Sequence, residues 1–422
     1  MKRVLTSFLA AGLISFSGLA QQDLAFQDVY QIIYHNNPFK ARDVYSTTKD
    51  NLSLVHQKFI EAFLDNAFGR LTESNEKITE LQNKLDQFPD SLQVALYTMK
   101  VENSLKLFEY KEAKIAIEHI LENYEDVLTK KAADEYRNGL TIFTAIENQP
   151  KQQITINGDQ KIKLKKDIFR MKKFTVKMDN DSFDFILDSG AALSVVSRSV
   201  AEKFKMNIIP VSIEALGSNA VTVFTQIAVC PVFYLGNIKI ENAVFLVIDD
   251  KDLTFGKLFF KYRVLGIIGL PIYAAFNELQ MTKDGYFLVP EKETVYEGSS
   301  NMARFNLTNL ISIEGNPYIF DTGSDVSSFF KPYYLANRDE IENKYKLKTI
   351  RFSSVGGSVK EKGYEIDVKL NVQGRDITLK KVHLSREDFI DMKGLWGLIG
   401  QDLIGQFEKV TLNFNQMFIK FE

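Results

Sequence analysis

Two short motifs in the chain each combine a carboxylate, a hydroxyl residue and a glycine: Asp188-Ser189-Gly190 and Asp321-Thr322-Gly323. Each motif follows an apolar run rich in aromatic and β-branched residues, which predicts that the aspartate lies at the end of a strand. If the fold brings the two carboxylates together, they cannot both ionise cheaply and will share a proton. One carboxylate then acts as an acid and the other as a base, which predicts acid–base chemistry on a substrate.

The two motifs belong to an internal duplication. A glycine-flanked apolar pair follows each motif at a similar distance, Ile267-Ile268 in the first case and Leu398-Ile399 in the second. Farther along, an offset of 131 residues relates Phe276 to Phe407 and likewise Phe287 to Phe418. Duplicated β units pack about a pseudo-twofold axis, as isologous dimers do. We therefore expect the two motifs to meet at this axis, with the glycine-flanked pairs as buried strands beneath them.

Each residue of the motifs has an expected role. Asp188 and Asp321 would be the catalytic pair, with a water molecule between them that attacks an amide without a covalent intermediate. The two motif glycines, Gly190 and Gly323, would let the backbone approach the opposite carboxylate closely. Ser189 and Thr322 could hydrogen-bond across the axis and hold the turns rigid. The alternative is that each aspartate is an ordinary turn residue, which would be the preferred interpretation for one copy alone.

At these motifs the chain resembles the aspartic proteases, both the retroviral-type and the pepsin-type enzymes. The segment at 398–402 is similar to the apolar-apolar-Gly-Arg-Asp element of the retroviral branch, with Gln401 in place of arginine. The fusion of two halves in one chain is similar to the pepsin-type enzymes. The length of each half is closer to that of one retroviral-type subunit, so the chain resembles such a subunit duplicated. The resemblance implies a mainly-β, bilobal fold with pseudo-twofold symmetry and lobes at 166–295 and 303–422.

The same resemblance implies an aspartic endopeptidase that needs no cofactor and cleaves a peptide or protein substrate in a cleft between the lobes. It also implies a glycine-rich hairpin, the flap, that closes over the substrate. The candidate flap glycines are Gly217 in the first half and Gly356 and Gly357 in the second.

The residue after each motif differs between the halves. Ser324 follows the second motif and Ala191 follows the first, so only one half offers a further hydroxyl to the ionised pair. We therefore expect a pH optimum less acidic than that of a digestive enzyme.

Residues 23–148 have the apolar spacing of α-helices. A shift of 36 residues superimposes Leu81 on Ile117 and Leu85 on Leu121, a period similar to that of tetratricopeptide repeats. Such repeats would offer a surface for a protein partner, and a plain helical bundle is the alternative. A polar linker that contains Pro150 is expected at 149–165, before the β-rich part.

The N-terminus has the features of a signal peptide. Lys2 and Arg3 precede an apolar run, and small residues at the end of 1–20 suit a signal peptidase. We expect export, to the periplasm or the medium, with no membrane span after cleavage; the alternative is a chain anchored by an uncleaved N-terminal segment. Cys230 is the only cysteine, so an internal disulfide is excluded and the domains must be stable through packing.

Composition narrows the functional classes. The formal net charge is −2 without a basic block, so the sequence gives no support for nucleic-acid binding. The four histidines show no ligand spacing and predict no metal site. Two rivals to an active protease remain. One is a catalytically silent protease fold that binds peptides while the helical domain binds a partner. The other is an enzyme whose helical domain blocks the cleft until it is displaced.

Overall fold

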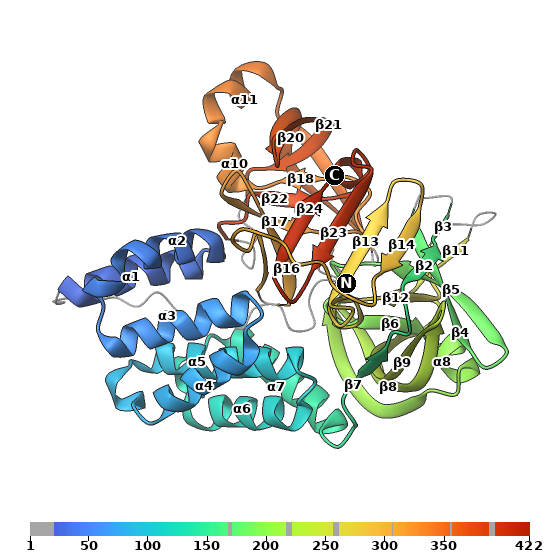
Figure 1. Ribbon diagram of the computed structural model, residues 1–422, viewed down its shortest axis with the longest axis horizontal. Coiled ribbons are helices and arrows are strands. Elements are labelled where there is room, and N and C mark those ends of the chain that lie inside the picture. The colour runs from blue at the N-terminus through green and yellow to red at the C-terminus, as the bar shows by residue number, and fades with distance from the viewer. Residues whose placement is uncertain are drawn as a thin grey trace.

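The structure is a computed structural model that describes residues 21–167, 171–216, 222–255, 261–305, 307–354, 357–387 and 393–422. The expected signal peptide at 1–20 lies outside the described residues. A helical part comes first in the chain and two β-rich halves follow (Figure 1). This order confirms the predicted fold class, an all-α part followed by a mainly-β part.

The helical part consists of α1 (Gln21–Tyr34), α2 (Pro38–Thr48), α3 (Leu54–Ala67), α4 (Leu71–Gln82), α5 (Asp90–Lys106), α6 (Tyr110–Asn123) and α7 (Lys130–Ile146). Polar residues begin several of these helices: the Ser53 and Thr129 hydroxyls accept the backbone N–H groups three residues on, as N-caps do. The predicted apolar stripes face inward, with Leu81 and Ile117 fully buried. The tetratricopeptide-like character of these helices stays a prediction. No helix within the described ranges is long and apolar enough to cross a membrane.

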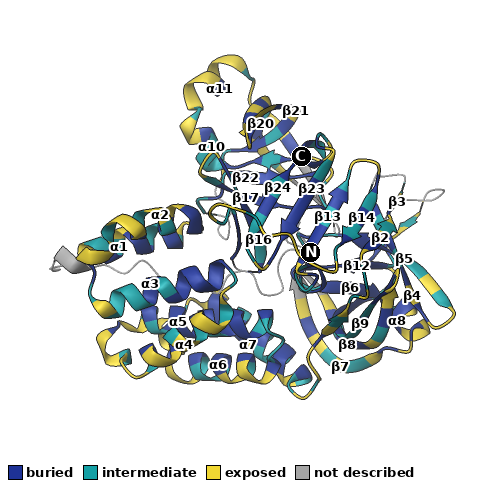
Figure 2. Cartoon of the chain, in the orientation of Figure 1, coloured by how far each residue is buried: buried dark blue, intermediate teal, exposed yellow. Residues whose placement is uncertain are grey.

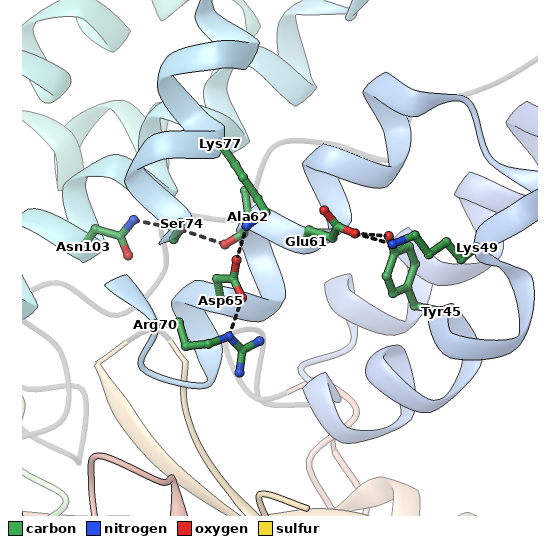
Figure 3. Close-up of polar contacts among 9 residues, drawn as sticks. All are labelled: Tyr45, Lys49, Glu61, Ala62, Asp65, Arg70, Ser74, Lys77 and Asn103. Carbon is green, nitrogen blue, oxygen red and sulfur yellow. Dashed lines mark hydrogen bonds and ion pairs between the residues drawn. The ribbon is translucent and has the colours of Figure 1, made fainter. Parts of the chain in front are cut away.

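Polar side chains connect successive helices (Figure 3). The buried Asp65 carboxylate on α3 accepts hydrogen bonds from Arg70, which precedes α4, and from Lys77 on α4. The Ser74 hydroxyl donates to the carbonyl of Ala62 and accepts from the Asn103 amide on α5. Buried polar groups of this kind are costly unless paired, so these bonds favour one arrangement of α3, α4 and α5.

The first β half is built mainly from a nine-stranded sheet of β1 (Gln153–Thr155), β3 (Lys165–Lys166), β4 (Lys172–Met178), β5 (Asp181–Leu187), β6 (Ser194–Ser197), β7 (Asn207–Leu216), β8 (Thr222–Leu235), β9 (Ile238–Ile248) and β12 (Gly266–Ile268). It also contains α8 (Arg198–Lys203), β10 (Thr254–Phe255), β11 (Tyr262–Arg263) and α9 (Leu270–Ala274). The additional pairing of β8 with β9 closes the sheet into a ring, and β7 stays at an edge. The interior strands are buried (Figure 2).

The second half contains an eight-stranded sheet of β15 (Met302–Phe305), β16 (Thr308–Ile313), β17 (Asn316–Phe320), β18 (Ser328–Phe329), β19 (Lys348–Ser354), β20 (Gly357–Val372), β21 (Arg375–Ser385) and β22 (Gly397–Ile399). The helices α10 (Lys331–Ala336), α11 (Arg338–Lys344) and α12 (Gln401–Ile404) accompany it. As predicted, both glycine-flanked pairs form buried strands: β12 pairs with β5, and β22 pairs with β17, each in parallel.

A third sheet joins the halves: β2 (Gln160–Lys163), β14 (Tyr286–Val289), β13 (Glu278–Thr282), β23 (Lys409–Asn413) and β24 (Phe418–Phe421), in that order. At its centre Gln280 lies opposite Thr411. These two residues are related by the sequence offset of 131, so each is paired with its own duplicate. The local twofold axis therefore passes between them. The first two strands of the β part, β1 and β2, lie within the range expected as a linker, and each pairs with a strand of the β part.

The helical part packs against both β halves. The amide side chain of Asn138 on α7 donates to the Glu214 carbonyl at 3.0 Å and accepts from the Glu214 N–H at 3.1 Å, in the manner of a neighbouring strand. This bond covers part of the exposed edge of β7. Phe63 on α3 packs edge-on against Phe305 of the second half, with ring centroids 5.3 Å apart. The helices and the β halves therefore share hydrophobic packing.

Candidate active site

Each motif begins where a buried strand ends. The backbone N–H of Asp188, directly after β5, donates to the carbonyl of Ile268 at 3.1 Å. The N–H of Asp321, directly after β17, donates in the same way to the carbonyl of Ile399 at 3.0 Å. The parallel strands β12 and β22 thus fix the position of the two aspartates from below. This is the support that the sequence predicted for the glycine-flanked pairs.

Hydrogen bonds cross between the two motifs in matched pairs. The N–H of Ser189 donates to the Thr322 hydroxyl at 2.9 Å, and the N–H of Thr322 donates to the Ser189 hydroxyl at 3.0 Å. The same two hydroxyls also reach the opposite strand ends, Ser189 donating to the Phe320 carbonyl and Thr322 to the Leu187 carbonyl. Both residues are almost completely buried. The two turns are therefore held against each other by a closed set of bonds.

The motif glycines lie against the opposite carboxylates. A Cβ atom on Gly190 would lie 2.6 Å from Oδ1 of Asp321, and a Cβ atom on Gly323 would lie 2.4 Å from Cγ of Asp188. No side chain fits at such distances, which explains the glycine at both positions. Asp188 Oδ1 also accepts the Gly190 N–H at 2.8 Å. Because both contacts involve Gly190, standard bond geometry places the two Oδ1 atoms at most about 8 Å apart.

The two carboxylates are oriented alike. Oδ1 of Asp321 accepts the Gly323 N–H at 2.9 Å, which repeats the bond that Asp188 receives from Gly190. Asp321 is 6% exposed and Asp188 is half-buried. The pair therefore presents two carboxylates with fixed inner oxygens at the junction of the two halves. Such a pair can activate a water molecule, provided that one of the two carboxylates carries a proton. Within the described ranges, no three His, Cys, Asp or Glu side chains are grouped as metal ligands would be.

Sequence reasoning missed Tyr273, which breaks the symmetry of the site. Its hydroxyl lies 3.0 Å from the Thr322 hydroxyl, and its ring is completely buried on α9. Burial, and then the negative charges of Asp188 and Asp321, raise the pKa of Tyr273 well above its usual value. Tyr273 thus remains a neutral hydrogen-bonding group beneath the aspartates. No local pattern around Tyr273 indicated this role, because the contact joins residues 49 positions apart.

Two serines that repeat at equal spacing also support the site. Ser194 and Ser327 each lie six residues after the motif aspartate, and their hydroxyls accept the N–H groups of Gly269 and Gly400, both at 3.0 Å. Their matched spacing is a signal that sequence comparison of the halves could have found. In the second half the Ser327 hydroxyl donates to Asp402 at 2.6 Å, and burial raises the pKa of Asp402. Gln401 occupies the position of the arginine in the retroviral-type element. Its side-chain amide donates to the Thr322 carbonyl at 2.8 Å.

The hydroxyl of Ser324 corrects one expectation. Instead of donating to the ionised pair, it donates to the Val326 carbonyl at 2.9 Å.

Of the candidate flap glycines, Gly217 and Gly356 lie outside the described residues, and Gly357 begins β20 opposite Ser354. The hairpins that lead to these positions, β7–β8 and β19–β20, are present in the two halves. The assignment of the flap itself stays a prediction.

A comparison with known families matches part of the first β half. The aspartyl protease family model matches residues 174–271, which include the first motif and β12. The matched segment supports the resemblance to the aspartic proteases that the motifs predicted. Two solved structures resemble the chain at low identity. A retropepsin-like aspartic protease from Rickettsia conorii is 15% identical, with 33% of this chain and 92% of that chain covered and a TM-score of 0.23.

The second solved structure is Basic 7S globulin from soybean. It is 8% identical, with 63% of this chain and 96% of that chain covered and a TM-score of 0.37. Among curated proteins, none matches the chain in sequence. The match to the aspartyl protease family thus lies within the first β half.

Proposed function

We propose that the chain is an aspartic endopeptidase in which Asp188 and Asp321 share a proton and hydrolyse peptide bonds. The observation that carries the proposal is the mutual approach of each motif glycine to the opposite carboxylate, because it requires the two aspartates to share one small space. A peptide would be the substrate, and it would lie against the pair between the two halves. The resemblance to the aspartic proteases supports the same reading.

The proposed reaction needs only the residues of the site and water. The ionised carboxylate takes a proton from a water molecule held between the pair, and the oxygen of that water forms a bond to the amide carbon. The protonated carboxyl gives its proton to the carbonyl oxygen, so negative charge does not accumulate on that oxygen. In the collapse of the tetrahedral intermediate, the carboxyl group that took the water proton gives it to the amide nitrogen and the C–N bond breaks. The other carboxylate recovers its proton from a hydroxyl of the intermediate as the product carboxyl group forms. The Gly190 and Gly323 N–H groups, and the bonds between Ser189 and Thr322, hold the carboxylates in place and so reduce reorganisation during the reaction.

A peptide library tests the proposal. The parent protein is expected to cleave peptides, whereas Asp188→Asn and Asp321→Asn are each expected to lose activity by at least about a thousandfold, since either change removes one partner of the acid–base pair. Asp184→Asn is the matched control: Asp184 lies on the same strand as the first motif, but its carboxylate binds Lys165 and Thr175. This variant should cleave like the parent. Tight capture of peptides by the parent without cleavage would instead support the peptide-binding module.

A further inference from the structure

A cavity of about 80 Å³ lies where the helical part meets both β halves. Its walls are mostly apolar and include Phe143 from α7, Leu246 from β9 and Leu193, which lies five residues after Asp188. Two cationic side chains, Lys106 from α5 and Arg304 from β15, complete the lining. The space suits a side chain of a few carbon atoms. Cations that line an apolar cavity indicate a ligand with an apolar body and a negative group.

Lys106 has no hydrogen-bonding capacity left for a ligand. Its ammonium donates to the carbonyl and the side-chain oxygen of Asn66, both at 3.0 Å, and to the backbone carbonyl of Arg304 at 3.1 Å. An ammonium group has three donors, and these bonds use all of them. The carboxylate of Glu102 lies 3.6 Å from this ammonium. Lys106 therefore holds the helical part against β15 and contributes charge to the cavity.

Arg304 is different, because its guanidinium is buried and one of its donors, the Nε–H group, is unused. The residue is 8% exposed, and its Nε has no hydrogen-bond partner. Burial lowers the pKa of Arg304 to about 10, although the charge of Glu102 raises it. When Lys106 is protonated, Lys106 and Arg304 together carry two positive charges beside the negative charge of Glu102. A buried cation with unmet donors is costly, which makes this position suited to an anion of single charge.

Asn309 adds a second unsatisfied group beside Arg304. The two residues lie directly opposite each other in the β15–β16 pair, so their side chains project from the same face of the hairpin. Asn309 is completely buried, and neither its Nδ2 nor its Oδ1 has a partner. The amide N–H groups and the amide oxygen of Asn309 are therefore available on the same face of the hairpin as the guanidinium. A ligand that carries a carboxylate and an N–H donor close to it can satisfy all of these groups.

We propose that this cavity binds an apolar amino-acid residue that carries a free carboxylate, such as the C-terminal residue of a peptide. Its carboxylate accepts from the Arg304 guanidinium and from Asn309 Nδ2, its peptide N–H donates to Asn309 Oδ1, and its side chain fills the apolar cavity. A bidentate carboxylate–guanidinium contact is among the stronger hydrogen-bonded pairs in proteins. Binding joins the helical part to both β halves.

Calorimetric titration and thermal denaturation with N-acetyl-leucine test the site. The measurement uses the Asp188→Asn chain, so that peptide cleavage plays no part and a failure of the proposed protease activity would leave the binding result intact. We expect saturable binding and a raised melting temperature. N-acetyl-leucinamide, which lacks the carboxylate, and 4-methylpentanoate, which lacks the N–H group, should each bind at least about tenfold more weakly. A leucine-terminated peptide should bind like N-acetyl-leucine if the natural ligand is a peptide end.

Two variants identify the residues. Arg304→Met should abolish binding, whereas Arg338→Met, a change at an exposed arginine on α11, should leave it unchanged. Asn309→Asp places a carboxylate of the chain itself opposite Arg304. We expect this variant to melt at a higher temperature than the parent and to bind N-acetyl-leucine at least about tenfold more weakly. Absence of binding, equal affinity for acid and amide, or unchanged affinity in Asn309→Asp would each overturn the proposal, and the last result stands even if Arg304→Met does not fold.

Discussion

Ser189 and Thr322 exchange backbone-to-hydroxyl hydrogen bonds of 2.9 and 3.0 Å across the junction of the two β halves. A hydroxyl has one donor, and that of Thr322 is used on the Leu187 carbonyl at 3.2 Å. The Tyr273 hydroxyl, 3.0 Å away, must therefore be the donor in its contact with Thr322. Thr322 is thus the most connected residue beneath the aspartates, and the two halves are related by symmetry without being equivalent.

The connections of Thr322 predict the effect of removing its hydroxyl. Thr322→Val keeps the shape of the side chain but leaves the buried Ser189 N–H and Tyr273 hydroxyl without an acceptor. We expect the free energy of unfolding to fall by about 1–3 kcal/mol. The value of kcat should fall about tenfold or more, because the aspartates lose their fixed positions. Denaturant unfolding and peptide hydrolysis measure the two effects. Thr322→Ser, which keeps the hydroxyl, should remain close to the parent, and a Thr322→Val protein as active as the parent would contradict the proposed role.

The motif glycines predict a steric loss of activity. Gly323→Ala would place a methyl group 2.4 Å from Cγ of Asp188, so the carboxylate or the turn must move. We expect kcat/KM to fall at least about a hundredfold, since a displacement near 1 Å is enough for such a loss. Gly190→Ala should behave alike, because its Cβ would lie 2.6 Å from Asp321.

Gly374→Ala is the control for this pair. Its Cβ would meet no atom within 4 Å, but its φ of +86° disfavours a side chain. This variant should lose about 1–3 kcal/mol of stability to backbone strain and keep the catalytic rate of the parent. Equal losses of rate in Gly374→Ala and Gly323→Ala would show that general destabilisation, and not the contact with the carboxylate, limits activity.

The residues that sequence reasoning placed correctly are those with a local, repeated signature. These signatures are the strand composition, the glycine after each hydroxyl residue and the apolar pair farther on. Each is a property of a short segment, and each occurs once in both halves. Tyr273, Asn138 and Arg304 show the limit of this approach. Tyr273 and Asn138 bond to segments far away in the chain, and Arg304 lines a cavity together with such segments, which no periodicity encodes. The sequence predicts a linker where β2 lies, because the pairing of β2 with β14 joins residues more than 120 positions apart.

The hydrogen bond from Ser324 to Val326 bears on the pH optimum of hydrolysis, which we still expect to be less acidic than that of a digestive enzyme. Because the Ser324 hydroxyl donates to the Val326 carbonyl, neither half supplies this donor to the ionised pair. A hydrogen bond to the charged form would extend activity to lower pH, so its absence favours an optimum less acidic than that of pepsin. Ser324→Ala should leave the acid limb of the pH–rate profile in place. A parent optimum below about pH 3 would contradict the expectation, as would an acid limb that moves toward neutral pH in this variant.

Lys106 predicts a pH dependence of stability. Burial lowers the pKa of this ammonium to about 7, against the attraction of Glu102, whereas an exposed lysine in the unfolded chain titrates near 10.4. Between these values the unfolded chain binds one proton more than the folded chain at this site. Stability contributed by this group therefore rises with pH above 7, by up to about 1.4 kcal/mol per pH unit. Below pH 7 both states carry the proton and the dependence on pH disappears.

Denaturant unfolding at pH 7, 8 and 9 measures this effect by comparison with Lys106→Met. The difference in unfolding free energy between parent and variant should move in favour of the parent as the pH rises, because the variant has no proton to release at this position. Glu102 keeps an opposite charge in Arg304 when Lys106 is removed, so the variant is expected to fold. Lys100→Met, a change on the same helix at a half-exposed position, serves as the control and should follow the parent curve. If the parent and Lys106→Met differ by the same amount at all three pH values, Lys106 keeps an ordinary lysine pKa and the buried ammonium does not govern this dependence.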